Sequence, residues 1–426
     1  FIEHPEWKNH PEWYVFEEYD GEQSIGGGTV GILDPCNINF SIDVEGWTEE
    51  QNQESENMLF DAIIYELRKA IDESNGLKSN IAFTLDDNYA WSKDGKSQAE
   101  MQKYGTAAGE YIHYVNKVAK KLKEFYPSIR VTIFAYNQTS IPPVKKDSKG
   151  KWVAIDNTVM LEDNVDVYLT MGAANRFYGL TDEHNQSTVD NVEMWQAVTS
   201  NFSFWTYGIT YYGNYFLPSG ALNSLNDTYN YLFSVGAQMV YEQGQYNQKA
   251  YTDWGTLKSY LVSKLMWDTT LSERTVIEDF FKNYFKNASK SMLELFDAEQ
   301  AWLAYLYDVK KAYVGSQNEG AINNIIDKAN KDNWPDALLQ QFLAKIDEAY
   351  NSIEELKRTD KELYSLLYDR ITLESLAFRY LRYEIYGSNY GDEKTEWCAS
   401  IYNDCKRLNL TQFSELVSIE TKFGQK

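Results

Sequence analysis

The chain has 426 residues, of which 43% are hydrophobic and 15% aromatic, and its formal net charge is −23. This length permits two or three domains with a sizeable core, while the acidic balance argues against nucleic acid and anionic membrane surfaces as partners. No run of about 18 apolar residues occurs, so no membrane span is expected. The chain opens with Phe1 and shows no signal peptide. We therefore expect a mature or trimmed protein that is secreted or held at the cell surface.

Neither the three cysteines nor the four histidines form a recognisable metal or disulfide pattern. Cys398 and Cys405 lie about two helical turns apart, too far for a bridge within one helix. The histidines are scattered, and no zinc or phosphate-loop motif occurs. Residues 26–31 have the GxGxxG spelling, but Pro35 blocks the helix that a dinucleotide site needs, so a glycine turn is expected. The sequence thus predicts no metal and no cofactor.

Strand-like and helix-like stretches alternate through the first two-thirds of the chain. The expected strands span residues 36–42, 81–85, 129–135, 165–171, 202–207 and 237–241. The expected helices span residues 47–74, 97–126, 192–199 and 228–234, with further helices from about 256 and 273. Such alternation predicts βαβ units and a parallel sheet. Residues 1–30 are expected to form an irregular loop or a short hairpin.

From about residue 288 the strand signals stop. The expected helices there span residues 288–315, 320–331, 334–358, 361–386 and 393–408. The fold class is therefore expected to be α/β: a (β/α)8 TIM-type barrel over residues 1–287, followed by an all-α helical bundle over residues 288–426. Because six strands fall short of eight, the first βα units are expected upstream of Phe1, in an N-terminal remainder of the same protein, unless residues 1–30 hide a degenerate strand.

The candidate site follows the expected strand 81–85, which ends on Asp86 and Asp87. Packing gives no reason for adjacent acids at a strand end, and barrels place their active sites at the carboxyl ends of the strands. An exposed Asp-Asp-Asn turn is the alternative, because Asp and Asn favour turns. Further polar and aromatic residues follow this and other strands, namely Asn88, Tyr136, Asn137, Trp205, Tyr207, Tyr211, Asn214 and Glu242.

These residue types fit the needs of a glycosidase. Such an enzyme requires an acid that protonates the leaving oxygen and a group that stabilises the oxocarbenium-like centre. The strand 202–207 ends without an acid, and Glu242 is the only acid after a late strand, so the carboxylates gather as an adjacent pair. An adjacent pair suits substrate-assisted retaining hydrolysis, in which the N-acetyl carbonyl of the substrate attacks.

The strand end Phe83-Thr84-Leu85-Asp86-Asp87-Asn88 resembles the aspartate pair of retaining β-N-acetylhexosaminidases and O-GlcNAcases. The wider pattern resembles a bacterial family of uncharacterised proteins with a glycoside-hydrolase-type barrel, related more distantly to α-glucuronidases. The remaining matching pieces are His10-Pro11-Glu12-Trp13, Ala135-Tyr136-Asn137 with Pro142-Pro143, Val240–Gly244 and Lys264–Asp268. That family more usually has a Pro-Asn-Asp-type turn where this chain has Leu-Asp-Asp.

The resemblance implies a barrel that acts on, or binds, a glycan containing N-acetylhexosamine. By analogy Asp86 would polarise the acetamido group and Asp87 would be the general acid/base, while the other residues of the candidate site would bind the sugar. Three alternatives stay open: a non-catalytic carbohydrate-binding barrel, an α-glucuronidase-like hydrolase, and a structural protein with no carbohydrate role. An α-glucuronidase needs cationic residues for the uronate, and Arg176 is the only arginine shortly after a late strand.

Overall fold

The computed structural model describes residues 5–15, 38–83, 85, 89–208, 215–218, 222–244, 253–312, 329–389, 391–414 and 416–424. The chain divides into two compact units. The first unit comprises Phe1–Thr170, Val189–Trp205 and Gly236–Tyr241, and the second comprises Met171–Thr188, Thr206–Val235 and Glu242–Lys426. The predicted boundary between residues 287 and 288 stays a prediction.

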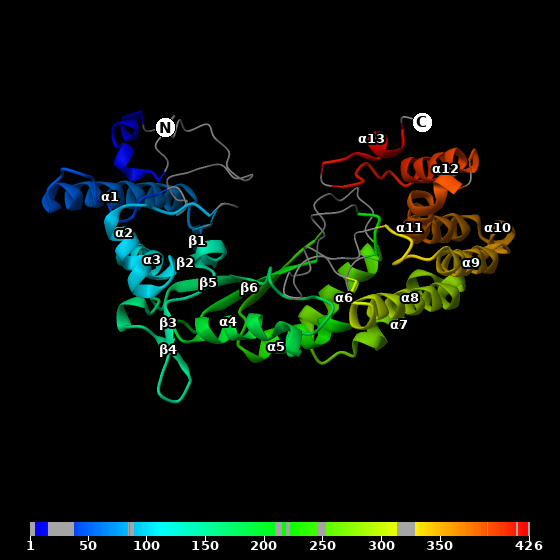
Figure 1. Ribbon diagram of the computed structural model, residues 1–426, viewed down its shortest axis with the longest axis horizontal. Helices are drawn as coiled ribbons and strands as arrows, with labels where there is room; N and C mark the ends of the chain where they lie inside the picture. The colour runs from blue at the N-terminus through cyan, green and yellow to red at the C-terminus, as the bar shows by residue number, and fades with distance from the viewer. Residues whose placement is uncertain are drawn as a thin grey trace. The chain divides into compact units, whose positions relative to one another are not determined.

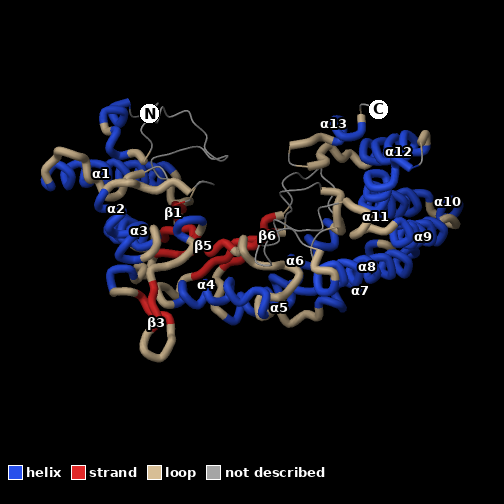
Figure 2. The backbone as a smooth tube through the Cα atoms, in the orientation of Figure 1, coloured by secondary structure: helices blue, strands red, loops and turns tan. Residues whose placement is uncertain are grey.

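The central element is a five-stranded sheet in the order β1-β2-β5-β6-β7, drawn in red in Figure 2. Its strands are β1 (Asn80–Phe83), β2 (Arg130–Ala135), β5 (Val165–Thr170), β6 (Phe202–Tyr207) and β7 (Met239–Gln243). The first four pair in parallel. β7 runs parallel to β6. The Gln238 N–H donates to the Phe202 oxygen and the Gly208 N–H donates to the Gln243 oxygen, so both strands advance in the same direction. The predicted parallel sheet is thus confirmed, whereas a complete eight-stranded barrel is not.

The strand predicted over residues 36–42 is wrong where the chain is described. Ile38 forms only an isolated antiparallel bridge with Tyr14. The side chain of Asn39 donates to the Glu12 oxygen at 3.2 Å and to a carboxylate oxygen of Asp94 at 2.5 Å. Such side-chain bonds offer the backbone an alternative to a strand ladder, so this segment joins neighbouring loops instead of the sheet.

Four helices accompany the sheet: α1 (Glu49–Glu73), α2 (Gly95–Tyr104), α3 (Ala108–Phe125) and α4 (Gln186–Gln196) (Figure 1). A capping box between Thr48 and Gln51 starts α1. The single helix predicted over residues 97–126 is in fact α2 and α3. Gly105 lies between them with φ +70°, a left-handed conformation that glycine adopts without strain and that ends a helix.

One face of the sheet is buried. The apolar stripe of α3, which includes Ile112 and Val115, is fully buried, and α3 packs against β2. Val131 and Ile133 on β2, like Val167 on β5, are also fully buried. Because side chains alternate between the faces of a strand, the residues in between point to the other face.

A hairpin that the sequence did not predict lies between β2 and β5. Its strands are β3 (Val144–Lys146) and β4 (Trp152–Ala154), and they pair antiparallel. Gly150 turns the chain between them with φ +79°. The lysine-rich sequence of β3 has little of the β-branched and aromatic character from which strands are recognised.

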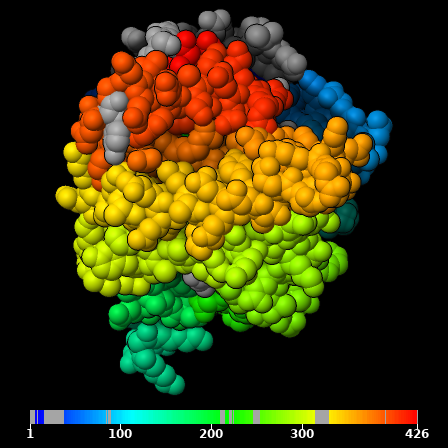
Figure 3. Space-filling model, turned by 90° about the vertical axis from the view of Figure 1, so that its right-hand side faces the viewer, coloured from blue at the N-terminus to red at the C-terminus, as the bar shows by residue number. Residues whose placement is uncertain are grey.

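The second unit is mainly helical. Its helices are α5 (Leu225–Ser234), α6 (Gly255–Trp267), α7 (Glu273–Tyr284), α8 (Ser289–Ala304), α9 (Asp336–Ile353), α10 (Leu356–Thr359), α11 (Lys361–Tyr386), α12 (Glu393–Arg407) and α13 (Ile419–Phe423). From α6 onward the long helices pack against their neighbours along the chain, and Figure 3 shows the later ones as successive layers. The predicted helix 320–331 lies outside the described residues. The predicted helix 288–315 ends early, in a π-helical turn over Tyr305–Val309.

Trp254 is the centre of the helical packing in this unit. Its ring is 1% exposed and lies 5.4 Å from the rings of Phe281 and Phe296. The indole N–H donates to Glu299 of α8, and the backbone N–H donates to Glu374 of α11 at 3.1 Å. A single residue at the start of α6 therefore connects three helices.

Short 3-10 helices complete the described structure, at Pro5–Asn9, Pro11–Trp13, Asn137–Thr139, Asn157–Val159, Glu183–Asn185, Leu222–Ser224, Lys286–Ala288 and Gly387–Asn389. Within the described ranges, none of the helices combines the length and the apolar character that crossing a membrane requires.

Candidate functional site

The segment that carries the two predicted catalytic aspartates starts at the carboxyl end of β1. Asp86, Asp87 and Asn88 themselves lie outside the described residues. The Phe83 oxygen accepts from the Tyr111 hydroxyl at 3.2 Å, and the Ala90 oxygen accepts from the side chain of Gln138 at 2.6 Å. Both ends of the aspartate-bearing segment are therefore fixed by hydrogen bonds, and Gln138 belongs to the turn that follows β2.

That turn contains two further predicted site residues, Tyr136 and Asn137. Asn137 has φ +46°, and the Thr139 hydroxyl donates to the Phe134 and Tyr136 oxygens at 3.0 Å each. Since β1 and β2 are neighbours, with Phe83 opposite Ile133, the residues after each strand leave the same edge of the sheet. The structure thus brings Tyr136 and Asn137 to the edge from which the aspartate segment departs.

The face of the sheet opposite to α3 carries four aromatic side chains from four neighbouring strands. Phe134 of β2 stacks on Tyr168 of β5 with ring centroids 5.3 Å apart. Trp205 of β6 lies 5.6 Å from Phe134 and 4.5 Å from Tyr241 of β7. Tyr241 is 43% exposed and the other three rings are half-buried. We call Phe134, Tyr168, Trp205 and Tyr241 the aromatic stripe.

The same face is charged nearer the amino ends of the strands. The Arg130 Nε donates to an Asp166 carboxylate oxygen at 2.5 Å, and Asp166 is 6% exposed. Asn80 donates to the Thr132 hydroxyl at 2.8 Å. These contacts connect β1, β2 and β5 on this face of the sheet.

Glu242 follows Tyr241 in β7 and points to the opposite face. Its carboxylate accepts from Arg176 Nη2 at 2.5 Å, from the Thr206 hydroxyl, and from the Tyr229 hydroxyl at 3.4 Å. Burial and then the charge of Glu242 raise the pKa of Tyr229 well above its usual value, so this phenol stays a proton donor. Glu242 therefore has a neutralising cation and two hydroxyl donors.

A narrow pocket surrounds this ion pair in the second unit. Its volume is about 30 Å³, room for a water molecule or two, and it is lined by Glu242, Arg176, Tyr207 and Tyr229, among other residues. Gly208 lies against Glu242, because a Cβ built there would be 2.7 Å from Glu242 Oε1. Tyr207 and Glu242, both predicted to bind sugar, thus line one pocket, whereas Trp205 belongs to the aromatic stripe.

Tyr211 and Asn214 lie outside the described residues. The sequence prediction did not include Phe134, Tyr168 and Tyr241. Phe134 and Tyr168 each stand between two core positions of a strand, where alternation places them on the other face, whereas the residues of β7 are half-buried or exposed and give no such indication for Tyr241. It mentioned Arg176 only as a possible uronate partner. Nothing in the sequence indicates its ion pair with Glu242, which is 66 residues away.

The His10–Trp13 motif has a packing role. The ring of His10 stacks on Trp13 with centroids 4.2 Å apart, and the Trp13 indole donates to Ser55 of α1 at 2.9 Å. Ser55 in turn donates to Glu12 at 2.7 Å. In the described part of the chain, His, Cys, Asp and Glu do not gather in groups of three or more that could hold a metal ion.

These features define a mixed α/β protein with a parallel sheet whose face opposite to α3 carries the aromatic stripe. A family match gives the relationship: the chain belongs to the family described as Domain of unknown function (DUF4838), which matches residues 2–297. A search of curated proteins finds no match. Among solved structures, the chain is similar to a GH138 enzyme targeting pectin rhamnogalacturonan II, at 10% identity and a TM-score of 0.35. The similarity covers 90% of this chain and 56% of that one, so this chain spans little more than half of the enzyme's length.

Proposed function

We propose that this protein is glycoside hydrolase-like and acts on glycans that contain N-acetylhexosamine. The aromatic stripe is the observation that carries the proposal. Aromatic rings offer sugars a flat apolar surface with a polar edge, and here four rings cross four strands beside the carboxyl edge of the sheet. Active sites of α/β sheets lie at that edge.

The proposed chemistry is substrate-assisted retaining hydrolysis. Asp86 would polarise the acetamido group, and Asp87 would protonate the leaving oxygen and then deprotonate the attacking water. In support, the segment that bears both aspartates leaves the sheet beside the turn of Tyr136 and Asn137.

A non-catalytic carbohydrate-binding protein is the second candidate, because the aromatic stripe could bind a glycan without the aspartates. The α-glucuronidase-like alternative is less well supported. Its uronate would need a cation, and the charge of Arg176 is already neutralised by Glu242 at 2.5 Å. We further propose that the protein is secreted or located at the cell surface, where it would encounter a glycan polymer.

Turnover of an aryl N-acetyl-β-hexosaminide by the full chain tests the catalytic proposal. We expect wild-type turnover, and a loss of at least a hundredfold in kcat for Asp87→Asn, the size of a general acid–base contribution. Asp61→Asn, on the exposed side of α1, is the matched control and should behave as wild type. Absence of turnover together with retained glycan binding would favour the non-catalytic candidate, and absence of both would contradict the proposal.

A further inference from the structure

The first unit contains a second pocket. It is formed by α1, α2, α3 and the segment before α1. Its volume is about 510 Å³, within the range of small-molecule sites. We call it the α1–α3 pocket. It is lined by Phe40, Ser41, Glu49, Gln53, Glu56, Leu59, Lys96, Ala99, Glu100, Glu110, His113, Tyr114 and Lys117. Four carboxylates against two lysines make the lining acidic.

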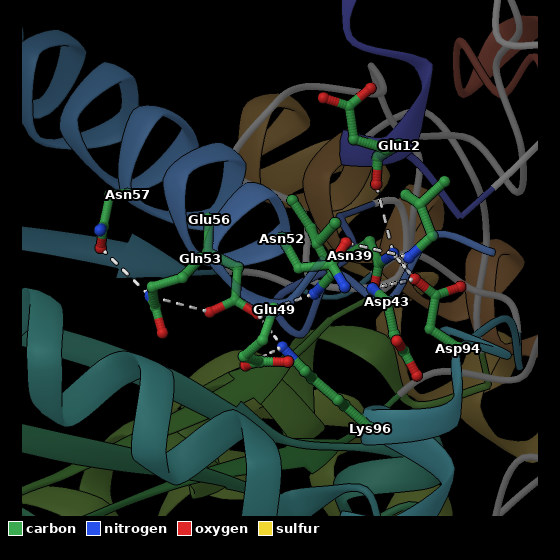
Figure 4. Close-up of polar contacts among 12 residues, drawn as sticks. Glu12, Asn39, Asp43, Glu49, Asn52, Gln53, Glu56, Asn57, Asp94 and Lys96 are labelled. Carbon is green, nitrogen blue, oxygen red and sulfur yellow. Dashed lines mark hydrogen bonds and ion pairs between the residues drawn. The ribbon is translucent and has the colours of Figure 1, made fainter. Parts of the chain in front are cut away.

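Most charges of this pocket are paired with one another. Lys96 Nζ lies 2.8 Å from Glu49 and 3.5 Å from Glu56, and Figure 4 shows it between the two carboxylates. Glu56 also accepts from the backbone N–H of Ile42 at 3.0 Å. His113 Nδ1 lies 3.1 Å from Glu100. These contacts fix the walls of the pocket, and Lys96 partly neutralises Glu49 and Glu56.

Glu110 differs from these wall residues. It is 3% exposed, and one carboxylate oxygen accepts from the Trp91 indole at 2.8 Å and from the Ser97 hydroxyl at 2.6 Å. Its other oxygen, Oε1, has no hydrogen-bond partner, and no lysine or arginine of the described residues forms an ion pair with it. Trp91 and Ser97 are neutral donors and bring no positive charge to this carboxyl group, and a buried carboxylate is costly unless a cation accompanies it.

Tyr114 is a second buried polar group without a partner. Its ring is 9% exposed and stacks on Phe40 with centroids 4.0 Å apart. Its hydroxyl forms no hydrogen bond within the part of the chain that the structure describes. Burial raises the pKa of this phenol, so it remains an O–H donor at neutral pH. An unsatisfied buried hydroxyl lowers the stability of the folded protein, and a ligand oxygen that accepts from it would recover that loss.

We propose that the α1–α3 pocket binds a small hydroxylated ammonium compound, of the class of an amino sugar. The ammonium group would pair with Glu110, and a ligand hydroxyl would accept from Tyr114. The apolar edge of the ligand would lie against Phe40 and Leu59. The acidic lining disfavours an anion, and the missing cation at Glu110 favours an ammonium group over a neutral ligand.

Three hexoses of similar size that differ in charge test this proposal by calorimetric titration at neutral pH: glucosamine, N-acetylglucosamine and glucuronate. We expect glucosamine to bind at least tenfold more tightly than the other two. Equal affinity for all three, tighter binding of glucuronate, or no binding of glucosamine would overturn the proposal. Turnover is not measured, so the result is independent of the proposed hydrolysis.

Two variants separate a binding role from a structural one. Glu110→Gln should abolish the preference for glucosamine over N-acetylglucosamine. Tyr114→Phe keeps the ring and removes only the unpartnered hydroxyl, so we expect at least threefold weaker glucosamine binding with no fall in Tm. Glu73→Gln, in the last turn of α1 and away from the pocket, is the control. Unchanged glucosamine affinity in Tyr114→Phe would contradict the assigned role of this hydroxyl even if Glu110→Gln failed to fold.

Discussion

The rings of Trp205 and Tyr241 lie 4.5 Å apart on neighbouring parallel strands, at an interplanar angle of 62°. The next residues along the two strands are Thr206 and Glu242, which hydrogen-bond to each other. Each strand therefore presents an aromatic ring to one face and a polar group to the other. This alternation separates the proposed glycan surface from the Arg176–Glu242 ion pair.

The ion pair should stabilise the second unit. Arg176→Met would leave the Glu242 carboxylate, only 10% exposed as a side chain, without its cation. We expect the free energy of unfolding to fall by on the order of 3 kcal/mol, because removing one partner leaves an uncompensated buried charge. Urea denaturation measures this loss. Arg358→Met, which breaks an exposed pair with Glu355, should change little. Equal effects of both variants would show that the pair has no special role.

Stability should depend on pH through Glu273, the first residue of α7. Burial raises the pKa of this carboxyl to about 7 from an ordinary 4.5. Between these values the folded protein binds more protons here than the unfolded protein, so stability falls as pH rises through the window and then levels off. In the wild type this carboxyl should lower the free energy of unfolding by on the order of 2 kcal/mol as the pH rises through this window, and Glu273→Gln should remove that change.

Urea midpoints between about pH 5 and 8 would reveal the effect. Glu278→Gln on the same helix, at an exposed carboxyl, is the matched control and should keep the wild-type slope. A Glu273→Gln variant whose stability varies with pH as steeply as the wild type would rule out this carboxyl as the source.

Gly208 should be required for the position of Glu242. A Cβ at this residue would lie 2.7 Å from Glu242 Oε1 and 3.2 Å from the Gln243 oxygen. We expect Gly208→Ala to displace the carboxylate and to lower the free energy of unfolding by about 1–3 kcal/mol, as overpacking does. A double-mutant cycle checks the cause: the same substitution should cost less in a Glu242→Ala background. If Gly208→Ala lowers the free energy of unfolding equally in the wild type and in the Glu242→Ala variant, contact with Glu242 is not the cause of the loss.

The sequence predicted the regular elements well where local pattern and tertiary structure agree. Strand β6 was predicted with its observed bounds, Phe202–Tyr207, because five of its six residues are apolar, aromatic or β-branched. Helix α11 was likewise predicted with its bounds, Lys361–Tyr386. The break at Gly105 was missed because a glycine inside a helical pattern can be tolerated, and only its left-handed conformation shows that the helix ends.

The candidate site was less accessible to sequence reasoning. Glu242 was grouped with Trp205 because both stand near strand ends, whereas the pleat places Glu242 on the face of Thr206. The ion pair with Arg176 and the stacking of Phe134 on Tyr168 join residues far apart in the chain, and such pairs follow from the strand order, which one sequence does not specify. The roles of Asp86 and Asp87 stay predictions.

Titration of an N-acetylhexosamine oligosaccharide against wild type and Tyr241→Ala tests the central claim most directly, since Tyr241 is the most exposed ring of the aromatic stripe. We predict measurable binding by wild type and about tenfold weaker binding by the variant, equivalent to about 1.4 kcal/mol. Phe233→Ala, which removes an exposed ring from α5, should bind as wild type does. Equal affinity of Tyr241→Ala and wild type, or no binding by wild type, would contradict the account.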